Sequence, residues 1–468
     1  MKKYISAGFP VLVLAVILLV IGVMHNMIDN QQDSVAKEQF MRNCAGCHGS
    51  RMERFAGNTW VKDAPDDHLV NAIRYGMPNE GMPAFSKAFT DEEINGLVRY
   101  IRSELKDKNK QSQTGSYATI QQSKYFSFKI DTVATGLDVP WGMVFLPDGD
   151  MLVTERSGQL FRFRNGKLAA IIEGVPPVFN RGQGGLMDII LHPDYRHNGW
   201  IYISYSQPTA NGDQGNTAIF RANLKNDRLV DHQYLFKAMP NSGRGVHFAG
   251  RLVFDDKGYL YFAVGERGNQ TDAQLLTNYN GKVHRLNADG TIPADNPFVN
   301  VKNAIPSIYS YGHRNPQGID INPVTREVWA NEHGPRGGDD INVIEKGKNY
   351  GWPVITYGIN YDGTIITPDT AKPGMMQPLY QWTPSIAPSS MAFVTGNRYP
   401  KWKGDVLSGS LSFKYLDRIR FDGRKVIERE RLLEGVGRVR NVKIGPDGFI
   451  YVAIEQPGVI IRLLPLKK

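Results

Sequence analysis

The sequence predicts a multidomain protein with an N-terminal transmembrane helix, a small all-α domain and a large all-β domain folded as a six-bladed β-propeller. Three observations predict this fold class. An uncharged apolar stretch covers residues 7–24, a capped amphipathic helix begins near residue 90, and a turn–strand unit recurs six times after residue 125. The predicted boundaries are 1–32 for the anchor and its stalk, 33–107 for the α domain, 108–122 for a linker and 123–468 for the propeller.

Composition supports a globular protein of two to three domains. The chain has 468 residues, of which 41% are hydrophobic and 22% charged. Two cysteines are too few for a disulfide-stapled scaffold or for a four-cysteine zinc or iron–sulfur site. The net charge is +9, and no run of five basic residues is present, so the sequence lacks the usual mark of a nucleic-acid-binding arm.

The apolar N-terminal stretch predicts a membrane anchor. Lys2 and Lys3 precede about 18 uncharged residues, a length near the lower limit for a spanning helix. The two lysines favour a cytoplasmic N-terminus, which sends the rest of the chain across the membrane. Because no small-x-small cleavage site follows, we favour an uncleaved signal anchor over a cleaved signal peptide. The expected location is the inner membrane of a bacterium, with the folded domains in the periplasm.

The α domain is predicted from its last helix. Thr90 and Glu93 form a capping box, and apolar residues follow at helical spacing. These are Ile94, Leu97, Val98 and Ile101. Residues 108–122 are polar and aperiodic, as expected of a linker between domains.

The α domain also carries a haem-attachment pattern. Residues 44–48 read Cys-Ala-Gly-Cys-His, in which two thiols add to the vinyl groups of haem and the next imidazole binds iron. A thioredoxin-like redox pair shares the C-x-x-C spacing. It needs no histidine at this position, however, and it would lie in a βαβ context that this segment lacks.

The second axial ligand is expected from residues 76–85, Gly-Met-Pro-Asn-Glu-Gly-Met-Pro-Ala-Phe. This stretch resembles the Met-Pro-x-Phe ligand loop of class I cytochromes c, and Met82 takes the ligand position, with Met77 as the alternative. The resemblance covers residues 34–105. It implies one covalent haem c held by Cys44, Cys47, His48 and Met82. His/Met ligation is typical of electron transfer and leaves no open position on the iron.

A repeated turn–strand unit predicts the propeller. Each copy is a turn of Pro, Asp, Asn or Gly followed by a short aliphatic and aromatic strand. The six strands begin at Met151, Trp200, Tyr259, Val328, Val406 and Phe449. The average of roughly 58 residues per copy suits a four-stranded blade with long loops. A pair of β-sandwiches, the alternative, would not require such a unit six times.

Polar clusters in the propeller loops are candidate site residues. Arg314, Arg438 and Arg440 could bind a polycarboxylate, although surface arginines are the simpler alternative. The loop 332–340 combines exposed backbone with carboxylates, which suits a hard cation such as calcium. His247, between glycines at a strand entrance, is a candidate general base, but a lone histidine is more often structural.

Residues 125–465 resemble the soluble quinoprotein glucose dehydrogenase and aldose sugar dehydrogenase family. Several strings carry the resemblance. They are Gly-Gln-Gly-Gly-Leu-Met-Asp at 182–188 with His-Pro-Asp at 192–194, Gly-His-Arg-Asn-Pro-Gln-Gly at 312–318, Glu-His-Gly-Pro-Arg-Gly-Gly-Asp-Asp-Ile-Asn at 332–342, Gly-Lys-Asn-Tyr-Gly-Trp-Pro at 347–353, Ala-Pro-Ser-Ser at 387–390 and Arg-Val-Arg at 438–440. The family is a six-bladed propeller that binds pyrroloquinoline quinone (PQQ) with calcium.

The resemblance implies a role for each matching residue. His247 corresponds to the base that takes the proton from the anomeric hydroxyl of the sugar. The positions that correspond to quinone contacts or pocket residues are Gln183, Arg314, Asn315, Arg438 and Arg440. Gly334 and Pro335 would give backbone carbonyls to the calcium at the quinone, and Asp340 and Tyr350 correspond to ligands of a second, structural calcium.

Three departures from the family pattern concern specificity. Val246 stands where the family often has an aspartate before the base. Ser412 replaces the family's lysine, and Lys414, on the same strand face, either substitutes for it or does not. Arg267 replaces a glutamine of the pocket, and an added cation there would favour acidic or differently oxidised substrates.

The function expected from these features is a PQQ- and calcium-dependent sugar dehydrogenase that oxidises the C1 hydroxyl of aldoses to the lactone. Its electrons would pass through its own haem to a respiratory acceptor, which is a cytochrome, a quinone or an oxidase. Two alternatives stay open: a dehydrogenase for another sugar-derived alcohol or aldehyde, such as a sorbosone-like compound, and a non-catalytic haem-tethered propeller that binds a partner.

Overall fold

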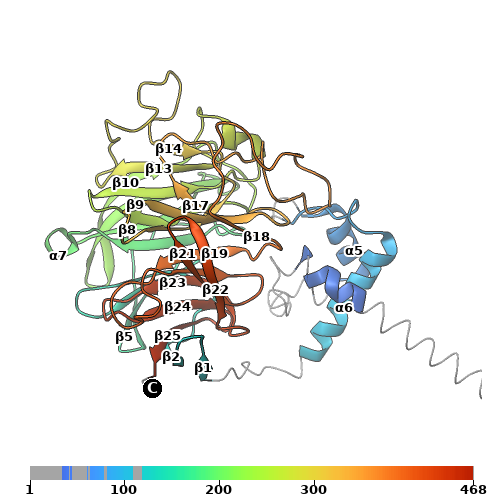
Figure 1. Ribbon diagram of the computed structural model, residues 1–468, viewed down its shortest axis with the longest axis horizontal. Coiled ribbons are helices and arrows are strands. Elements are labelled where there is room, and N and C mark those ends of the chain that lie inside the picture. The colour runs from blue at the N-terminus through green and yellow to red at the C-terminus, as the bar shows by residue number, and fades with distance from the viewer. Residues whose placement is uncertain are drawn as a thin grey trace, which may run out of the picture. The chain divides into compact units, whose positions relative to one another are not determined.

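The computed structural model describes residues 34–41, 43–44, 61, 64–77, 82–108 and 119–466. The chain forms two compact units, a helical one of Met1–Tyr75 and Phe85–Ser112 and a β-rich one of Gln113–Lys468 together with Gly76–Ala84. Figure 1 shows both units. No helix within the described residues is long and apolar enough to cross a membrane, and the predicted anchor, 1–32, lies outside them.

The helical unit is built around helix α6, Asp91–Lys108. The predicted capping box is confirmed, because the Glu93 amide donates to Thr90 Oγ1 at 3.2 Å and the Thr90 amide donates to Glu93 Oε2 at 2.8 Å. The predicted apolar face is also confirmed. Its four residues, Ile94, Leu97, Val98 and Ile101, are all buried. Helix α5, Asp66–Tyr75, and the helical residues 34–41 complete the described part.

The β-rich unit is a six-bladed propeller, as predicted. Five sheets have four strands and the last has five. Blade 1 contains β3 Pro140–Phe145, β4 Met151–Glu155, β5 Leu160–Arg164 and β6 Lys167–Ile171. Blade 2 contains β7 Leu186–Leu191, β8 Trp200–Pro208, β9 Gly215–Lys225 and β10 Arg228–Lys237. Blade 3 contains β11 Leu252–Phe254, β12 Tyr259–Val264, β13 Lys282–Asn287 and β14 Ile308–Tyr311.

The remaining blades follow the same order. Blade 4 contains β15 Pro316–Ile321, β16 Val328–Glu332, β17 Asp339–Ile344 and β18 Tyr380–Trp382. Blade 5 contains β19 Pro388–Phe393, β20 Val406–Ser410, β21 Leu416–Asp422 and β22 Lys425–Leu432. Blade 6 contains β23 Arg438–Ile444, β24 Ile450–Glu455, β25 Val459–Pro465, β2 Ser127–Ala134 and β1 Ile120–Gln122. Two short helices, α7 Tyr195–Asn198 and the 3₁₀ helix η2 Gln270–Gln274, lie in the connections.

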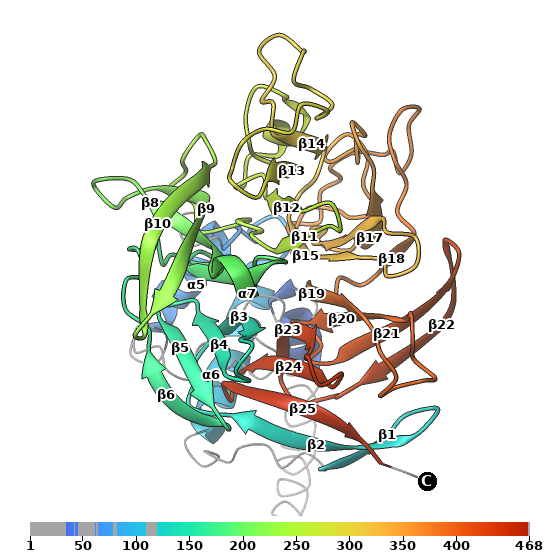
Figure 2. The same ribbon diagram turned by 90° about the vertical axis from the view of Figure 1, so that its left-hand side faces the viewer.

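The first strand of each blade lies at the centre of the ring. Strands β3, β7, β11, β15, β19 and β23 contact one another in sequence, and β23 returns to β3. Figure 2 shows the sheets radiating from this centre to rim strands such as β6, β10 and β22. Each of the six strands predicted from the repeat is the second strand of a blade, that is, β4, β8, β12, β16, β20 and β24. The recurring turn is therefore the hairpin between the first and second strands.

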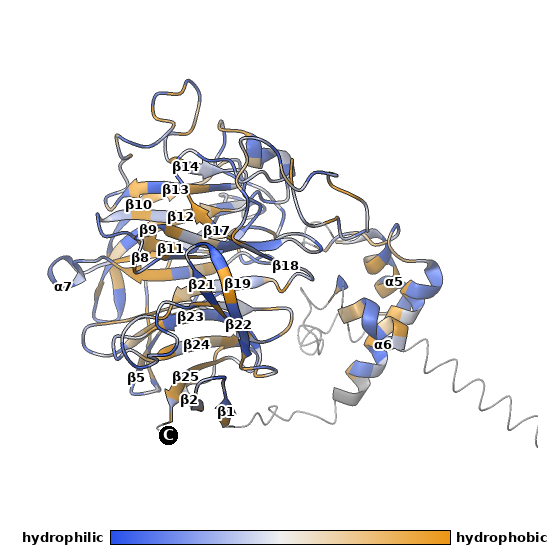
Figure 3. Ribbon diagram, viewed as in Figure 1, coloured by the Kyte–Doolittle hydropathy of each residue, from blue (hydrophilic) through white to orange (hydrophobic). Residues whose placement is uncertain are grey.

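Apolar packing between neighbouring blades explains why these strands read as continuous hydrophobic runs. Six of the core clusters among the described residues lie between adjacent blades, one for each pair. Strand β4, for example, is buried at all five residues because both faces of its sheet are covered. Figure 3 shows the apolar segments, in orange, along the strands.

The ring is closed by a strand from the N-terminal side of the propeller. β2 pairs antiparallel with β25, so blade 6 combines the two ends of the β unit. β1 extends this sheet by pairing with β2, and it begins at Ile120, within the segment predicted as linker. Residues 109–118, the rest of that linker, lie outside the described residues.

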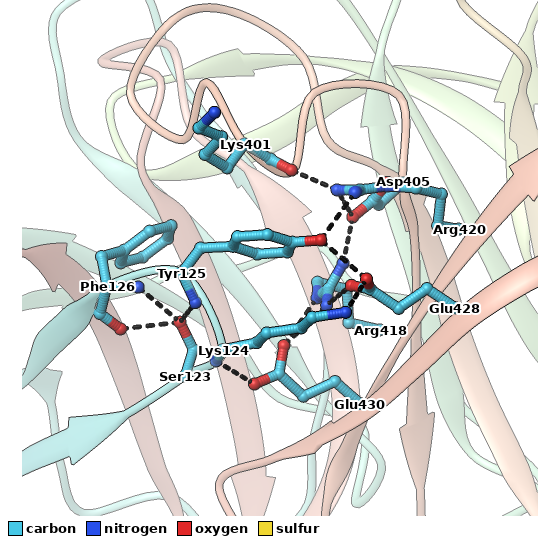
Figure 4. Close-up of polar contacts among 10 residues, drawn as sticks. All are labelled: Ser123, Lys124, Tyr125, Phe126, Lys401, Asp405, Arg418, Arg420, Glu428 and Glu430. Carbon is cyan, nitrogen blue, oxygen red and sulfur yellow. Dashed lines mark hydrogen bonds and ion pairs between the residues drawn. The ribbon is translucent and has the colours of Figure 1, made fainter.

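The segment that enters β2 is fastened to blade 5 by a set of charges (Figure 4). Arg418 is fully buried and contacts Asp405, Glu428 and Glu430. Tyr125 donates its hydroxyl to Glu428 at 2.7 Å, and the Lys124 amide donates to Glu430 at 2.6 Å. We call these residues, together with Arg420, which donates to the Tyr125 hydroxyl at 2.9 Å, the Arg418 network.

Candidate active site

All the predicted site residues of the propeller lie at one of its ends. This end, called the site end here, is where the innermost strands begin and the second strands finish. The connections that meet there precede β7, β11, β15 and β23 or follow β12, β16 and β20. The antiparallel order of each blade brings these distant segments together, whereas the repeated turns lie at the opposite end.

His247 is held by contacts on its backbone and on its ring. Its amide donates to Gln183 Oε1 at 2.8 Å, which brings two predicted site residues together. Its Nδ1 lies 2.7 Å from Glu266 Oε1, and its Nε2 has no hydrogen-bond partner in the described part of the chain. The pKa of His247 is lowered, mainly by burial and also by the charges of Arg314 and Arg267, while Glu266 acts in the opposite direction. A neutral ring that donates from Nδ1 to a carboxylate leaves Nε2 as a proton acceptor.

Glu266 was missed by the sequence analysis. Its side chain is 2% exposed, and burial alone would raise its pKa, but the contacts with His247 and the charge of Arg314 outweigh this effect and lower the pKa. The carboxylate is therefore ionised beside the imidazole. It follows β12 by two residues, where a single glutamate in the sequence carries no motif of its own.

Arg314 and Asn315 lie beside His247. Asn315 is fully buried and its Oδ1 accepts the Ala249 amide at 3.1 Å, two residues after His247. The guanidinium of Arg314 donates to the Gly334 carbonyl at 2.9 Å. This contact joins a predicted quinone contact to a predicted calcium ligand. The Arg314 Nε is buried without a partner in the described residues.

Arg438 and Arg440 share one carboxylate, Glu455, which the sequence analysis also missed. Arg438 Nε donates to Glu455 Oε2 at 2.9 Å and Arg440 Nε donates to Oε1 at 2.6 Å. The pairing of β23 with β24 has a bulge between Val439 and Asn441. Both arginines nevertheless reach Glu455, the last residue of β24. Burial lowers the pKa of Arg440, and the nearby charges of Arg438 and Arg156 lower it further.

Two further basic groups lie at this end. Arg156 follows β4 and donates to the carbonyl of Gly182, next to Gln183, a role that no motif indicated. Lys414 is 8% exposed with a φ of 57°, so its backbone is in the left-handed region. The segment that carries Lys414 lies against Arg438, whose Nη1 donates to the Leu411 carbonyl at 2.9 Å.

Arg267 does not present a cation to the pocket in the way the sequence suggested. Its side chain is buried, and its guanidinium donates to the carbonyls of Val246, Arg244 and Gly215 and lies over the Phe248 ring. The expectation that this residue favours acidic substrates through direct contact is therefore wrong. Its guanidinium instead binds the backbone of the segment that carries His247, and its charge acts on the His247 ring from there.

Three of the four predicted calcium ligands, Gly334, Asp340 and Tyr350, line one cavity of about 40 Å³ with Arg314, whereas Pro335 does not line it. Glu332 and Asp340 are opposite each other across β16 and β17, so two carboxylates lie side by side. The pKa of Asp340 is raised well above its usual value by burial and by the charges of Glu332 and Asp339. Crowded carboxylates of this kind suit a hard cation.

The other members of this group supply main-chain oxygens. The Gly334 amide donates to Asp339 at 2.8 Å, and a Cβ on Gly334 would lie 2.3 Å from the Gly337 carbonyl, so only glycine fits. The Tyr350 hydroxyl donates a hydrogen bond to the Val343 carbonyl and accepts one from the Glu345 amide. Tyr350 would therefore reach a cation through its carbonyl. The described residues hold no cluster of three or more His, Cys, Asp or Glu side chains arranged for a metal.

The haem segment is described in part. Cys44 is half-buried and its amide donates to the Phe40 carbonyl at 2.8 Å, whereas Cys47 and His48 lie outside the described residues. Met77 and Met82 exchange two backbone hydrogen bonds of 2.8 and 3.1 Å. This tight closure places both sulfur-bearing residues on adjacent chain segments, so either one could be the axial ligand.

Comparisons with known proteins agree with this geometry. The model of the glucose/sorbosone dehydrogenase family matches residues 137–462, and the model of cbb3-type cytochrome c oxidase subunit III matches residues 31–101. The aldose sugar dehydrogenase YliI of Escherichia coli is 43% identical over 344 residues, which are 72% of this chain and 92% of that protein.

Solved structures give the same result. The crystal structure of the soluble aldose sugar dehydrogenase of Escherichia coli in its apo-form has a TM-score of 0.70 at 41% identity, covering 72% of this chain and 100% of that one. The PQQ-bound aldose sugar dehydrogenase of Streptomyces coelicolor has a TM-score of 0.59 at 28% identity, covering 72% and 98%. The chain therefore belongs to the glucose/sorbosone dehydrogenase family. N-terminal to its propeller in the sequence, it carries a cytochrome c domain like that of cbb3 oxidase subunit III.

Proposed function

We propose that the protein oxidises aldose sugars at the C1 hydroxyl with PQQ and calcium, and that the electrons pass through its own haem c to a respiratory acceptor. The observation that carries this proposal is the His247–Glu266 pair beside the buried arginines. A proton acceptor and an anion-binding cluster at one end of a propeller are what sugar oxidation by an anionic quinone requires.

The arginines fit the quinone. PQQ carries three carboxylates, and Arg314, Arg438 and Arg440 are all buried at the site end. Glu455 neutralises part of the charge of Arg438 and Arg440, so this pair retains a net positive charge. The orphaned Nε of Arg314 is a further donor for an anion. Gln183 and Asn315 would complete the contacts, with Lys414 as an additional cation.

The carboxylates and carbonyls of the 332–340 loop fit calcium. Gly334 and Pro335 would give backbone oxygens to the calcium at the quinone. Asp340 and Tyr350 would bind the second, structural calcium, which would relieve the mutual repulsion of Asp340 and Glu332. When bound, the quinone supplies the two-electron acceptor and calcium increases its electrophilicity.

The chain's own residues handle the proton. His247 Nε2 takes it from the C1 hydroxyl, and the ionised Glu266 stabilises the imidazolium that forms. Gln183 and Asn315 hold the backbone on either side of His247, so the ring stays in one orientation.

The electron route and the location rest on the N-terminal region. Cys44, Cys47, His48 and Met82 would hold the haem, and the match to a cytochrome c family supports that role. The apolar stretch 7–24 supports an inner-membrane anchor with both domains in the periplasm, where respiratory acceptors are available.

The experiment is reconstitution of the full chain with PQQ and calcium, followed by addition of aldoses and observation of haem reduction. We expect reduction that depends on both cofactors and is abolished in His247→Ala. No haem reduction with any sugar or polyol would contradict the enzymatic function. Turnover that survives in His247→Ala would contradict the assignment of the base.

A second candidate substrate class is favoured by one observation. Val246 leaves no carboxylate immediately before the base, so the site lacks an acceptor for a sugar hydroxyl there. A sorbosone-like aldehyde or another sugar-derived alcohol needs this acceptor less. A panel of aldoses, polyols and osones, ranked by kcat/KM, distinguishes the two classes. PQQ titration of the apo-protein distinguishes both from a binding module, which would show no thermal shift.

A further inference from the structure

Arg267 is a buried cation whose two terminal nitrogens donate to main-chain carbonyls, while its Nε has no hydrogen-bond partner among the described residues. It follows Glu266 directly and is 1% exposed. Its Nη2 donates to the Arg244 carbonyl at 2.8 Å and to the Gly215 carbonyl at 3.2 Å, and its Nη1 donates to the Val246 carbonyl. Its Cζ lies 3.4 Å from the centre of the Phe248 ring. Two of the three carbonyls and the ring belong to residues 244–248, the segment that carries His247.

This segment has an unfavourable backbone. His247 and Ala249 have φ values of 54° and 55°, in the left-handed region that residues with a Cβ rarely adopt. Such conformations persist only where the surroundings hold them. The peptide between Val246 and His247 is held at both ends, since Arg267 binds its carbonyl and Gln183 binds its amide. Close packing reinforces this, because a Cβ on Gly265 would lie 2.2 Å from the His247 carbonyl.

We propose that Arg267 is a positioning residue for His247, which fixes the main chain under the imidazole and, through its positive charge, favours the proton-accepting form of the ring. The proposal rests on the role of His247 as the base. Glu266 and Arg267 are adjacent in the sequence and both contact the His247 region. Glu266 binds the His247 ring, and Arg267 binds the backbone next to it.

The charges around His247 have opposing effects. Burial lowers the pKa of His247, Glu266 counteracts this, and Arg314 and Arg267 lower it further. His333, the fourth titratable neighbour, is neutral because burial and the charge of Arg314 lower its pKa to about 3. Arg267 itself has a pKa lowered to about 9 by burial, so it is positively charged at neutral pH.

Only arginine fits this role. Its planar guanidinium reaches carbonyls on two sides at once and stacks on Phe248. A lysine at this position keeps the charge, but its compact ammonium lacks the spread of the two terminal guanidinium nitrogens over these carbonyls and the planar stacking on Phe248. A glutamine loses the charge as well as most of the contacts. The two substitutions therefore separate the positioning effect from the charge effect.

The test compares Arg267→Lys, Arg267→Gln and, as a matched control, Arg418→Lys, all in the full chain loaded with PQQ and calcium. Arg418 is an equally buried arginine, but its partners are Asp405, Glu428 and Glu430 rather than the segment that carries His247. We expect both Arg267 variants to lose roughly 10- to 100-fold in kcat with little change in KM. The acid limb of kcat/KM should stay in place in Arg267→Lys and move to higher pH in Arg267→Gln. Arg418→Lys should lower Tm without either change.

A second measurement does not depend on turnover. The rate at which diethyl pyrocarbonate modifies His247 in the apo-protein, followed by peptide mapping, reports the neutral fraction of the ring. At acidic pH this rate should fall in Arg267→Gln and not in Arg267→Lys. If no substrate is turned over, the proposed function fails while this measurement still tests the influence of Arg267.

Two results would overturn the proposal. One is a wild-type kcat, acid limb and modification profile in both Arg267 variants. The other is a loss of activity that tracks Tm as it does in Arg418→Lys, with the acid limb of Arg267→Gln unmoved, since Arg267 would then be a stabilising residue alone.

Discussion

At the scale of single residues, the contact between His247 and Glu266 determines how the base works. We expect Glu266→Gln to reduce kcat/KM by about 10²-fold, because the imidazolium loses its ionised partner. The carboxylate raises the pKa of His247, so its loss should move the acid limb of the pH–rate profile to lower pH. This shift is opposite to that expected for Arg267→Gln. Glu266→Asp, which keeps the charge, is the control, and an unshifted limb in Glu266→Gln would contradict the pairing.

Lys282 gives a second prediction at this scale. It is fully buried in β13, its ammonium donates to the carbonyls of Asp272, Ala273 and Asn280, and burial lowers its pKa to about 7. The unfolded chain binds this proton up to about pH 10.4, so the contribution of Lys282 to stability increases as the pH rises above about 7.

The corresponding variant is Lys282→Met. Its free energy of unfolding should rise less steeply than that of the wild type between pH 7 and pH 9, by up to about 1.4 kcal/mol per pH unit. Urea unfolding of both proteins at several pH values measures the difference. Parallel curves would show that Lys282 does not titrate in this range.

Residue identity predicted part of the site, and contacts between distant residues supplied the rest. Arg314 was recognised because it belongs to a long string of residues, whereas His247 and Arg440 were recognised from short local patterns and the family resemblance. Glu455 and Glu266 were missed, because what defines them is the partner they meet in space, 15 and 19 residues away along the chain. Arg267 was noticed but assigned to the pocket, since the sequence does not show in which direction a side chain points.

At the scale of elements, one regularity could have revealed the missing carboxylates. Strands β4, β16 and β24 all end on a glutamate, namely Glu155, Glu332 and Glu455, and Glu266 lies two residues beyond β12. In three blades this glutamate is opposite the first residue of the innermost strand. Four of the six repeats thus place a buried acid at the site end, a signal that alignment of the repeats with one another would have shown.

The boundaries of elements were predicted less well than their existence. The six second strands of the blades were found from the repeat, because a turn residue and a hydrophobic run mark each of them. β1 was assigned to the linker, since Ile120–Gln122 is a short polar segment whose strand conformation depends on its pairing with β2. The strand conformation of such a segment therefore depends on its pairing partner rather than on the character of its own residues.

The capping box of α6 gives a prediction at this scale. Thr90→Ala removes the acceptor for the Glu93 amide, and we expect a loss of about 1 kcal/mol from the stability of the helical unit. Thr90→Ser, which retains the hydroxyl, should be close to wild type. Thermal unfolding followed by circular dichroism measures both, and equal stability of the alanine and serine variants would exclude the cap.

At the scale of the whole molecule, ring closure depends on the segment before β2. Arg418→Met leaves Glu430 without its cation and reduces the charged partners of Asp405 and Glu428 to Arg420 and Lys124 respectively. It should therefore destabilise the propeller by up to about 3–5 kcal/mol. Lys124→Ala, at the exposed edge of the same network, should change stability little. Equilibrium unfolding in urea distinguishes the two, and similar losses would show that burial of Arg418 is not the cause.

The union of two domains in one chain makes a kinetic prediction. If the haem accepts electrons from the propeller of the same molecule, the first-order rate of haem reduction should not depend on protein concentration. A rate that increases in proportion to concentration would show that electrons pass between molecules. A stopped-flow dilution series of the sugar-treated holoenzyme measures this directly.

The closure of blade 6 also determines how the molecule bears mechanical load. A pull on the N-terminal side of the propeller reaches Lys124 and Tyr125 before it reaches the β2–β25 ladder. The Arg418 network therefore bears the applied force first. The β2–β25 ladder is thereby protected from sequential rupture of its hydrogen bonds. In a single-molecule stretching experiment, Arg418→Met should lower the force at which blade 6 unfolds. The other five blades are each formed by consecutive strands, so they should unfold at an unchanged force.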